Sequence, residues 1–488
     1  MAKKLFFAGL SALLAVAGIV VYNAATMESK QVDVAAAPSV EIDVEAAAAR
    51  LSKAVTFKTV SYQDPTEFDG AQFEGLHAFL AESFPRVHAT LQREVVSKWS
   101  LLYTWPGSDA SLKPVVLMAH LDVVPVVQGT EDDWEHEAYS GSIADGYVYG
   151  RGTMDDKASA VAILEAVEKL IEQGRQPTRT ILLAFGHDEE VGGAFGAAPI
   201  VGALESRGVT PEFVLDEGGA IVSGAMPGIE APVATVGVAE KGYMTVKLTV
   251  NVDGGHSSQP PRETAIGIMS EAITRLQNKQ MPGGIDGLSA EMLAYVGPEM
   301  PFGLRIAMGN LWLFAPLIER QFAASPVMNA FLRTTTAPTI IQGGTKENVL
   351  PPEVSAIINF RILPGDTRDD VISHIAEVIA DQRVGIEPFL DQAQEASNVS
   401  PSDGPIFDVI QRTIREVAPG TVVTPYLVIG ATDARKFQAI CEHVYRFLPM
   451  QIHSDDLKRM HGTNERIAVE AYETMIQFYY RLIVNAAM

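Results

Sequence analysis

The chain has 488 residues, 47% of them hydrophobic and 20% charged, a composition typical of a globular protein of roughly three domain-sized units and not of a disordered or fibrous one. Its formal net charge of −23 argues against a protein that binds the phosphate backbone of nucleic acids. Cys441 is the single cysteine, so the chain forms no internal disulfide, and histidine and carboxylate side chains must supply the ligands of any metal site.

The N-terminal segment, residues 1–26, is predicted to be a membrane anchor or a signal peptide. Lys3 and Lys4 precede an uncharged run from Leu5 to Tyr22, which as a helix would be about 27 Å long and just able to cross the bilayer core. Small residues follow the run without a clean A-x-A cleavage site, so we expect an uncleaved anchor. The lysines place the body outside the cytoplasm in either case, and a cleaved chain would be secreted or periplasmic.

Two patterns of secondary structure follow a predicted linker at residues 27–42. Residues 43–238 alternate short apolar runs, typical of buried strands, with helical patterns. This order predicts an α/β domain with parallel strands, and residues 397–488 return to it. The segments that carry the pattern are the strand-like runs Val115–Ala119, Thr180–Gly186 and Phe213–Leu215, and the helical runs Asp156–Gln173 and Arg466–Val484.

Residues 239–396 have a different order, β-α-β-β-α-β, which predicts an inserted α+β domain of the ferredoxin-like, split-βαβ type. An apolar, proline-containing insertion at 281–336 interrupts it. We expect this insertion to add to the core of the inserted domain. An acyl-chain pocket or a membrane-facing patch is the alternative.

Histidines and acidic residues follow the ends of the predicted strands, where open α/β sheets bind ligands. The first run continues into His120 and Asp122, which point the same way in extended backbone, so the carboxylate can orient the imidazole. An acidic residue at a helix start, such as Asp156, is ordinarily a helix cap. Several such segments together predict a site for zinc or a similar divalent ion, with enough donors for two ions.

Eight segments, in this order, resemble the two-zinc exopeptidase and aminoacylase family, which includes carboxypeptidase G and the succinyl-diaminopimelate desuccinylases. They are M-A-H-L-D-V-V-P, G-R-G-T-M-D-D-K, D-E-E-V-G-G, L-D-E-G-G, G-G-H-S-S-Q-P-P, N-F-R-I-L-P-G-D-T, G-A-T-D-A-R and H-G-T-N-E-R. The resemblance covers residues 43–488 and is strongest to the carboxypeptidase S and N-acyl-amino-acid hydrolase branch. It implies a mixed sheet with helices on both faces and an inserted domain that serves as lid and dimerisation surface.

The resemblance also implies two zinc ions per chain, with Co²⁺ or Mn²⁺ as possible replacements. The implied ligands are His120 and Asp216 for one ion, Glu190 and His461 for the other, and Asp155 between the two. Glu217 is an alternative to Asp216, because aminoacylase-like members carry the same D-E-G sequence. The peptide bond between Asp155 and Asp156 is expected to be cis, as it is in the family.

Further roles come from the same resemblance. Asp122 orients His120, and Glu189 is the general base. His256 reaches the scissile carbonyl oxygen from the partner subunit of a homodimer, although a plain turn residue is the alternative. Arg361 binds the free carboxylate of the substrate, unless it makes only a structural ion pair. Asn348 and Gly430 are weaker substrate-binding candidates.

The predicted activity is metal-dependent hydrolysis of the amide bond next to the C-terminal amino acid of small peptides. An N-acyl-amino-acid amidohydrolase is the alternative within the same class. A non-enzymatic alternative, a membrane-tethered dimer that binds peptides, would require a broken site, whereas every matched position is filled. The sequence has no G-x-S-x-G segment and no G-x-G-x-x-G segment after a strand, which disfavours serine hydrolases and dinucleotide enzymes.

Overall fold

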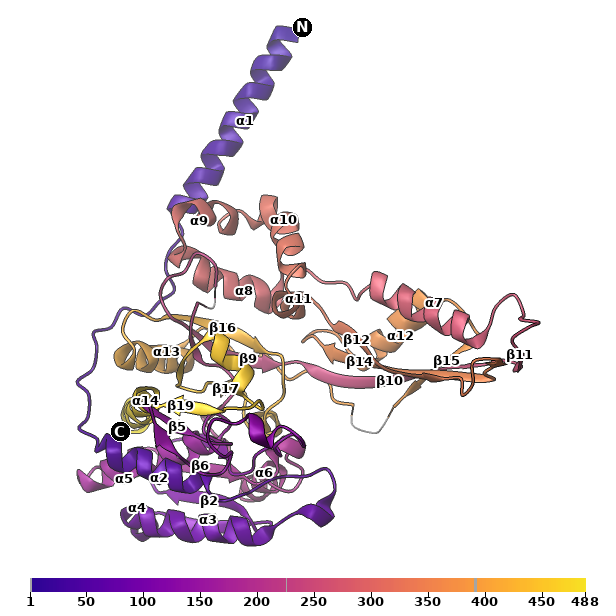
Figure 1. Cartoon of the computed structure of the whole chain (residues 1–488). Coiled ribbons are helices and arrows are strands. Elements are labelled where there is room, and N and C mark those ends of the chain that lie inside the picture. The colour runs from indigo at the N-terminus through magenta and orange to yellow at the C-terminus, as the bar shows by residue number, and fades with distance from the viewer. Residues whose placement is uncertain (1, 225, 390–392) are drawn as a thin grey trace.

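The computed structural model describes residues 2–224, 226–389 and 393–488. Its main parts are a large mixed sheet with its helices, a smaller domain to one side, and an N-terminal helix that projects from the body (Figure 1). The large sheet has ten strands in the order β1-β2-β6-β3-β7-β17-β9-β8-β18, with β16 paired to β9. The strands are β1 (Gln92–Val96), β2 (Ser100–Trp105), β3 (Val115–His120), β6 (Ile181–Gly186), β7 (Phe213–Asp216), β8 (Ile221–Ser223), β9 (Val233–Glu240), β16 (Val422–Val428), β17 (Val444–Arg446) and β18 (Gln451–His453).

Helices cover both faces of this sheet, because side chains on its central strands alternate between two cores. Leu117 on β3 points into the larger core, whereas its neighbours Val116 and Met118 point into the smaller one. The larger core is covered by α2 (Val44–Val55), α3 (Gly70–Ser83), α4 (Pro85–Thr90), α5 (Lys157–Glu172), α13 (Pro405–Val417) and α14 (Val469–Ala487), and the smaller by α6 (Ala197–Ser206). The predicted α/β class with helices on both faces is confirmed.

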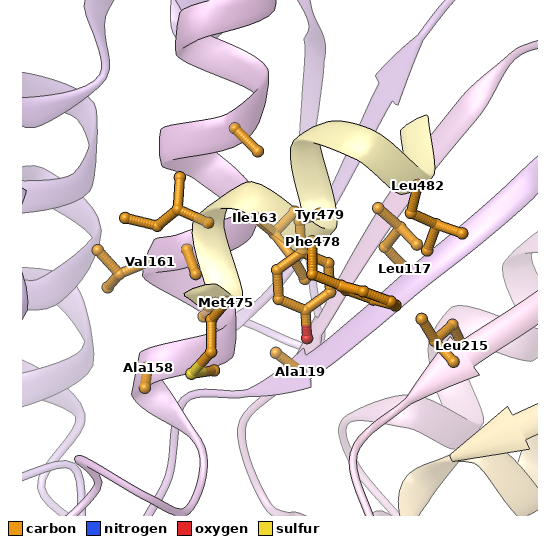
Figure 2. Close-up of a cluster of buried hydrophobic side chains, with 14 of the residues drawn as sticks. Leu117, Ala119, Ala158, Val161, Ile163, Leu215, Met475, Phe478, Tyr479 and Leu482 are labelled. Carbon is orange, nitrogen blue, oxygen red and sulfur yellow. The ribbon is translucent and has the colours of Figure 1, made fainter. Parts of the chain in front are cut away.

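The C-terminal helix α14 packs directly beneath the strands that lead to the site. Its Phe478 and Tyr479 rings lie between α5 and the strand residues Leu117 and Leu215 (Figure 2). All four side chains are at most 2% exposed. A densely packed core of this kind resists movement, so the ends of β3 and β7 and the start of α5 are held in fixed positions.

The smaller domain is a four-stranded antiparallel sheet in the order β12-β14-β10-β15. Two helices pack on it around a core of its own, and the strand order is that of a split-βαβ unit. The elements are β10 (Gly242–Asn251), α7 (Ala265–Asn278), β12 (Thr335–Gly343), β14 (Glu353–Ile362), α12 (Arg368–Ile379) and β15 (Val384–Pro388), with the short pair β11 (Gly255–His256) and β13 (Val349–Leu350) at the far tip (Figure 1).

The insertion at 281–336 folds into four helices, which are α8 (Gly287–Val296), α9 (Phe302–Met308), α10 (Leu311–Ala323) and α11 (Pro326–Leu332). Met292, Leu293 and Phe331 of these helices pack with Val422 and Leu427 of β16. The expectation that this segment adds to the core of the inserted domain is met by Met281, which is buried in that core, but it is wrong for the helices. Their apolar side chains cover the large sheet at β16, a choice of partner that periodicity cannot indicate.

The first 42 residues consist of a helix that projects from this body and a segment that lies along its surface. Helix α1 (Ala2–Ala25) is the one candidate membrane span among the described residues, with a mean hydropathy of 2.3 over Lys3–Ala25. Residues 27–42 have no helix or strand but follow the surface. The side chain of Gln31 donates to the Val423 carbonyl at 2.9 Å and accepts from the Val423 amide at 2.8 Å. A third, small sheet consists of β4 (Ile143–Ala144), β5 (Tyr147–Tyr149) and β19 (Arg466–Ala468).

Candidate active site and metal centre

His120 and Asp122 lie where three parallel strands end. His120 is the last residue of β3 and pairs with Gly186, the last residue of β6, while β7 runs parallel on the other side. The His120 Nδ1 atom lies 3.0 Å from the Asp122 carbonyl oxygen and 3.4 Å from its Oδ1 atom. The Nε2 atom is thereby left facing the site. Both residues are almost fully buried.

Asp155 lies between two imidazoles that come from opposite ends of the chain. Its Oδ1 atom is 2.8 Å from His120 Nε2, and its Oδ2 atom is 2.9 Å from His461 Nε2. His461 Nε2 is also 3.2 Å from Glu190 Oε2. Four of the five predicted metal ligands therefore come together with Asp122, the residue predicted to orient the first of them. The four are His120, Asp155, Glu190 and His461. The peptide bond between Asp155 and Asp156 is cis, as expected.

Glu465 fixes the loop that carries Asp155. Its Oε1 atom accepts hydrogen bonds from the amides of Gly152, Met154 and Asp155 at 2.9, 2.8 and 3.3 Å. Its Oε2 atom pairs with Arg151, which also donates to the His461 carbonyl at 3.2 Å. Arg151 and Glu465 lie in two of the eight segments that resemble the family. Their sequence positions do not indicate this role, because only the fold shows that the two segments meet.

Glu189 and Glu190 begin a short 3-10 helix after β6, and Asp122 anchors both of them. Its two carboxylate oxygens accept the amides of Glu189 and Glu190, each at 3.1 Å. The following loop passes Asp433 so closely that a Cβ at Gly193 (φ 64°) would lie 1.8 Å from Asp433 Oδ1. The left-handed φ and the close approach explain a glycine at this position.

Glu217, rather than Asp216, faces the site. Its Oε1 atom is 3.6 Å from His120 Nε2, and it forms a group of possible metal ligands with His120 and Asp156. The Oδ2 atom of Asp216 instead accepts the Ala434 amide at 2.7 Å. The choice of Asp216 over Glu217 thus requires correction. Asp216 is the last residue of β7 and Glu217 lies in the bend that follows it, so the change in backbone direction separates the two side chains.

Asp156 also differs from its expected role. It precedes α5, but its side chain makes no capping hydrogen bond. Both carboxylate oxygens are buried and lack a hydrogen-bond partner among the described residues. Burial, together with the nearby Glu217, raises the pKa of Asp156 well above its usual value. Asp156 is therefore a buried carboxyl of the site and not a helix cap.

The electrostatics of the cluster favour bound cations. Burial and the nearby Asp155 raise the pKa of Glu217 to about 8, and burial raises that of Glu190. Hydrogen bonds with Asp155 and Glu190 raise the pKa of His461 to about 10. Crowded, buried carboxylates are stabilised in their ionised form by positive charge. Two imidazoles and several carboxylates without thiolates are a donor set suited to zinc and similar divalent ions. Two groups of possible ligands share His120, one with Asp155 and Glu190 and the other with Asp156 and Glu217.

The predicted substrate-binding residues lie apart from this cluster. His256 and Asn348 are at the tip of the small domain (Figure 1), where His256 pairs with Val349 and is exposed. Arg361 lies on β14 with its guanidinium 5.0 Å from the centre of the Tyr243 ring. Gly430 is exposed in the loop after β16. Within one chain, the described structure therefore does not bring the side chains of His256, Asn348 and Arg361 to the cluster.

Comparison with known proteins identifies the family. Residues 116–485 match the sequence profile of peptidase family M20/M25/M40. The chain belongs to this family. The match includes every residue of the cluster described above, and the resemblance inferred from the eight segments is confirmed.

Curated relatives cover nearly the whole chain. A probable carboxypeptidase S-like 2 of Dictyostelium discoideum is 44% identical over 447 residues, 91% of this chain and 85% of that protein. The human N-fatty-acyl-amino acid synthase/hydrolase PM20D1 is 42% identical over 442 residues, 89% and 87% of the two chains. Carboxypeptidase S of Saccharomyces cerevisiae is 33% identical, with coverages of 89% and 83%. Both kinds of protein in the branch suggested by the sequence, carboxypeptidase S and N-acyl-amino-acid hydrolases, are represented.

Solved structures share the fold. An M20 family metallo-carboxypeptidase from Sulfolobus solfataricus superposes with a TM-score of 0.62 and 14% identity, covering 91% of this chain and 99% of that one. Human carnosine dipeptidase 1 superposes with a TM-score of 0.60 and 15% identity, covering 91% and 96%. The family match and the curated relatives show that the protein is an enzyme of a metallopeptidase family that hydrolyses amide bonds, and the non-enzymatic alternative is not retained.

Proposed function

We propose that this chain is a membrane-tethered, two-zinc carboxypeptidase that removes the C-terminal amino acid from small peptides. The observation that carries the proposal is the meeting of His120, Asp155 and His461, with Glu190 and Glu217 on either side and Glu189 next to them. These residues come from the end of β3 and from four further segments, which meet at one edge of the large sheet.

Each ion would have its own terminal ligands. His120 and Glu217 would hold one and His461 and Glu190 the other, with one oxygen of Asp155 toward each imidazole. Divalent ions bound at such a site lower the pKa of a water toward about 7 and polarise the substrate carbonyl. The three carboxylates contribute three negative charges against four positive ones, which leaves room for one further anionic ligand.

Glu189 is the proposed general base. It would accept the proton of the attacking water and then donate it to the nitrogen of the leaving amino acid. Asp122 supports this role in two ways, because it fixes the ring of His120 and holds the amide of Glu189 at 3.1 Å. Asp122 therefore positions His120 and Glu189 and would not contact the substrate itself.

The lid would complete the site. The partner subunit's His256 is proposed to donate a hydrogen bond to the carbonyl oxygen as negative charge develops on it. Arg361 would bind the carboxylate of the departing amino acid, with Asn348 and Gly430 beside the substrate. The support for a dimer is that His256 is exposed at the lid tip, away from the cluster of its own chain, and that a two-fold axis makes such a contact reciprocal.

The N-terminal helix is proposed to remain as the membrane tether, with the body on the extracytoplasmic side. Its last turn is part of the folded protein. Asn310, which is fully buried, donates to the Val20 carbonyl and accepts from Asn23 Nδ2, each at 2.9 Å. Ala24 is fully buried as well. Cleavage after residue 25 would remove two of the four hydrogen bonds of the Asn310 side chain and leave those with the Ile306 carbonyl and Trp312 Nε1, and the loss of hydrogen bonds by a buried polar group is costly.

An N-acyl-amino-acid hydrolase is the second candidate. Both substrates place an amide carbonyl next to an amino acid with a free carboxylate, so the same residues would act on either. The observation that favours this candidate is the 42% identity to a fatty-acyl-amino acid synthase/hydrolase over 89% of the chain.

A matched substrate panel decides between the two. Purified full-length protein loaded with zinc would be offered dipeptides and N-acyl amino acids that release the same amino acid. A higher kcat/KM for dipeptides supports the carboxypeptidase, and a higher value that increases with acyl length supports the alternative. Hydrolysis of neither series, by protein whose zinc content has been verified, would contradict both.

A further inference from the structure

Helices α9 and α10 carry apolar side chains that the protein leaves uncovered. From Pro301 to Ile318 the sequence has one charged residue, Arg305. The opposite face of α10 is apolar as well, because Ile318 is buried and Leu311 and Phe322 pack against the core beside β16. We call the uncovered surface the α9–α10 platform. Its residues are Phe302 (47% exposed), Leu304 (39%), Trp312 (62%), Leu313 (44%) and Leu317 (61%).

Both faces of α10 thus require cover from water. The first turns of α10 are apolar on both sides, and Glu319, Arg320 and Gln321 follow in its second half. A contiguous exposed apolar surface marks an interaction site. The inner face is covered by the protein. The outer face requires an occupant that is itself apolar.

The position of the platform identifies this occupant. Helices α9 and α10 lie at the foot of α1, on the side of the molecule from which α1 projects (Figure 1). Trp312 Nε1 donates to Asn310 Oδ1 at 3.2 Å, the same atom that accepts from Asn23 at 2.9 Å. Trp312 therefore lies level with the end of the apolar run of α1, where a spanning helix leaves the bilayer. Tryptophan is enriched at that level in membrane proteins.

We propose that the α9–α10 platform is a second membrane contact, seated in the headgroup and acyl boundary of the bilayer that α1 crosses. The inference rests on the membrane tether proposed above. Amphipathic surfaces of this kind insert about 5–10 Å into the boundary. A second protein copy fits this place less well, because α1 projects from the same surface beside it. The platform and α1 together fix the orientation of the body relative to the membrane.

Quenching of Trp312 fluorescence by brominated lipids tests the proposal. The chain has four tryptophans; Trp105 and Trp134 are buried and Trp99 is partly buried, so Trp312 is the accessible one. Full-length protein would be placed in phosphatidylcholine nanodiscs with bromine near the headgroup end of the acyl chains, with unbrominated discs as reference. Trp312→Phe supplies the signal of the other three tryptophans.

The expected result is a loss of roughly half or more of the Trp312 emission, as for a side chain within the boundary. The double variant Leu313→Gln/Leu317→Gln should reduce this quenching, whereas Leu112→Gln, an exposed leucine far from the platform at 36% exposure, should not. Equal emission in brominated and unbrominated discs would overturn the proposal, whether the platform faces water or a second copy.

The tether is checked separately by the intact mass of the mature chain. If the chain has lost α1, the tether proposal fails, but the platform still predicts that the processed protein floats with brominated vesicles and shows the quenching. If the chain keeps α1 and Trp312 is not quenched, the platform proposal alone fails.

Discussion

The metal cluster and the tip of the lid contain histidines in opposite environments. His120 is 1% exposed and held by Asp122 and Asp155, whereas His256 is exposed and, among the described residues, its imidazole hydrogen-bonds only Ser258 of its own turn. A buried histidine among carboxylates has its partners within the chain. An exposed one on a projecting strand has its function decided by what docks against it. The following predictions test this difference.

Removal of a cluster histidine should have the largest effect. His461→Ala deletes one imidazole next to Asp155 and Glu190, so the protein should lose metal and its activity should fall to background, while the circular dichroism spectrum is retained. The matched control is His453→Ala. The side chain of His453 is 57% exposed and that of His461 is 53% exposed, so both variants remove an imidazole of similar exposure. Normal zinc content and activity in His461→Ala would remove it from the metal site.

Replacement of the proposed base should leave the metal in place. Glu189→Gln is isosteric and keeps the hydrogen bond from the backbone amide of residue 189 to Asp122. Because the amide side chain cannot accept the proton, kcat should fall by about 10²–10⁴-fold, the usual range for general acid–base catalysis. Zinc analysis of the same preparation provides the comparison. If metal is lost together with activity, the roles of Glu189 and Glu190 are interchanged.

The lid histidine should act across the dimer. His256→Ala should reduce kcat by about 10²–10³-fold, as for the loss of an oxyanion donor, and leave metal content unchanged. Mixing His256→Ala subunits with Glu189→Gln subunits should restore activity, because one site of the mixed dimer then has both residues. No restoration in demonstrated heterodimers would mean that His256 does not act in trans.

The smallest effect is expected at Asp216. Asp216→Asn keeps an oxygen that can accept the Ala434 amide, so activity should stay within about tenfold of the unchanged protein, equivalent to one weakened hydrogen bond. Its neighbour is the comparison: Glu217→Gln should lower the zinc content toward one ion per chain. The reverse result, with metal lost in Asp216→Asn and kept in Glu217→Gln, would restore the sequence-based choice.

The cluster itself could be predicted in part from the sequence. His120, Asp155, Glu190 and His461 follow apolar runs or glycine-rich segments, and burial of such runs in a parallel sheet brings their ends to one edge. Asp216 was preferred to Glu217 because a resemblance gives the position of a motif and not the direction of each side chain. The helix-cap interpretation of Asp156 has another origin, since it follows from the position of an acidic residue at a helix start. The role of Glu465 depends on its contacts with Arg151 and the loop of Asp155, which are distant from it in sequence.

The sequence alone determined the α/β class of the main domain through its local periodicity. It determined the class of the enzyme and the polar character of its site through the resemblance of eight ordered segments to a known family. Only the tertiary structure decided which neighbour of a pair faces the metal, and that helices α8 to α11 cover the large sheet at β16 and not the lid. It also decided that Asn310 binds the end of α1, so that the platform and the N-terminal helix meet. The physical reason is that apolar patterns state how much surface must be buried, whereas the packing partner depends on contacts between residues far apart in the chain.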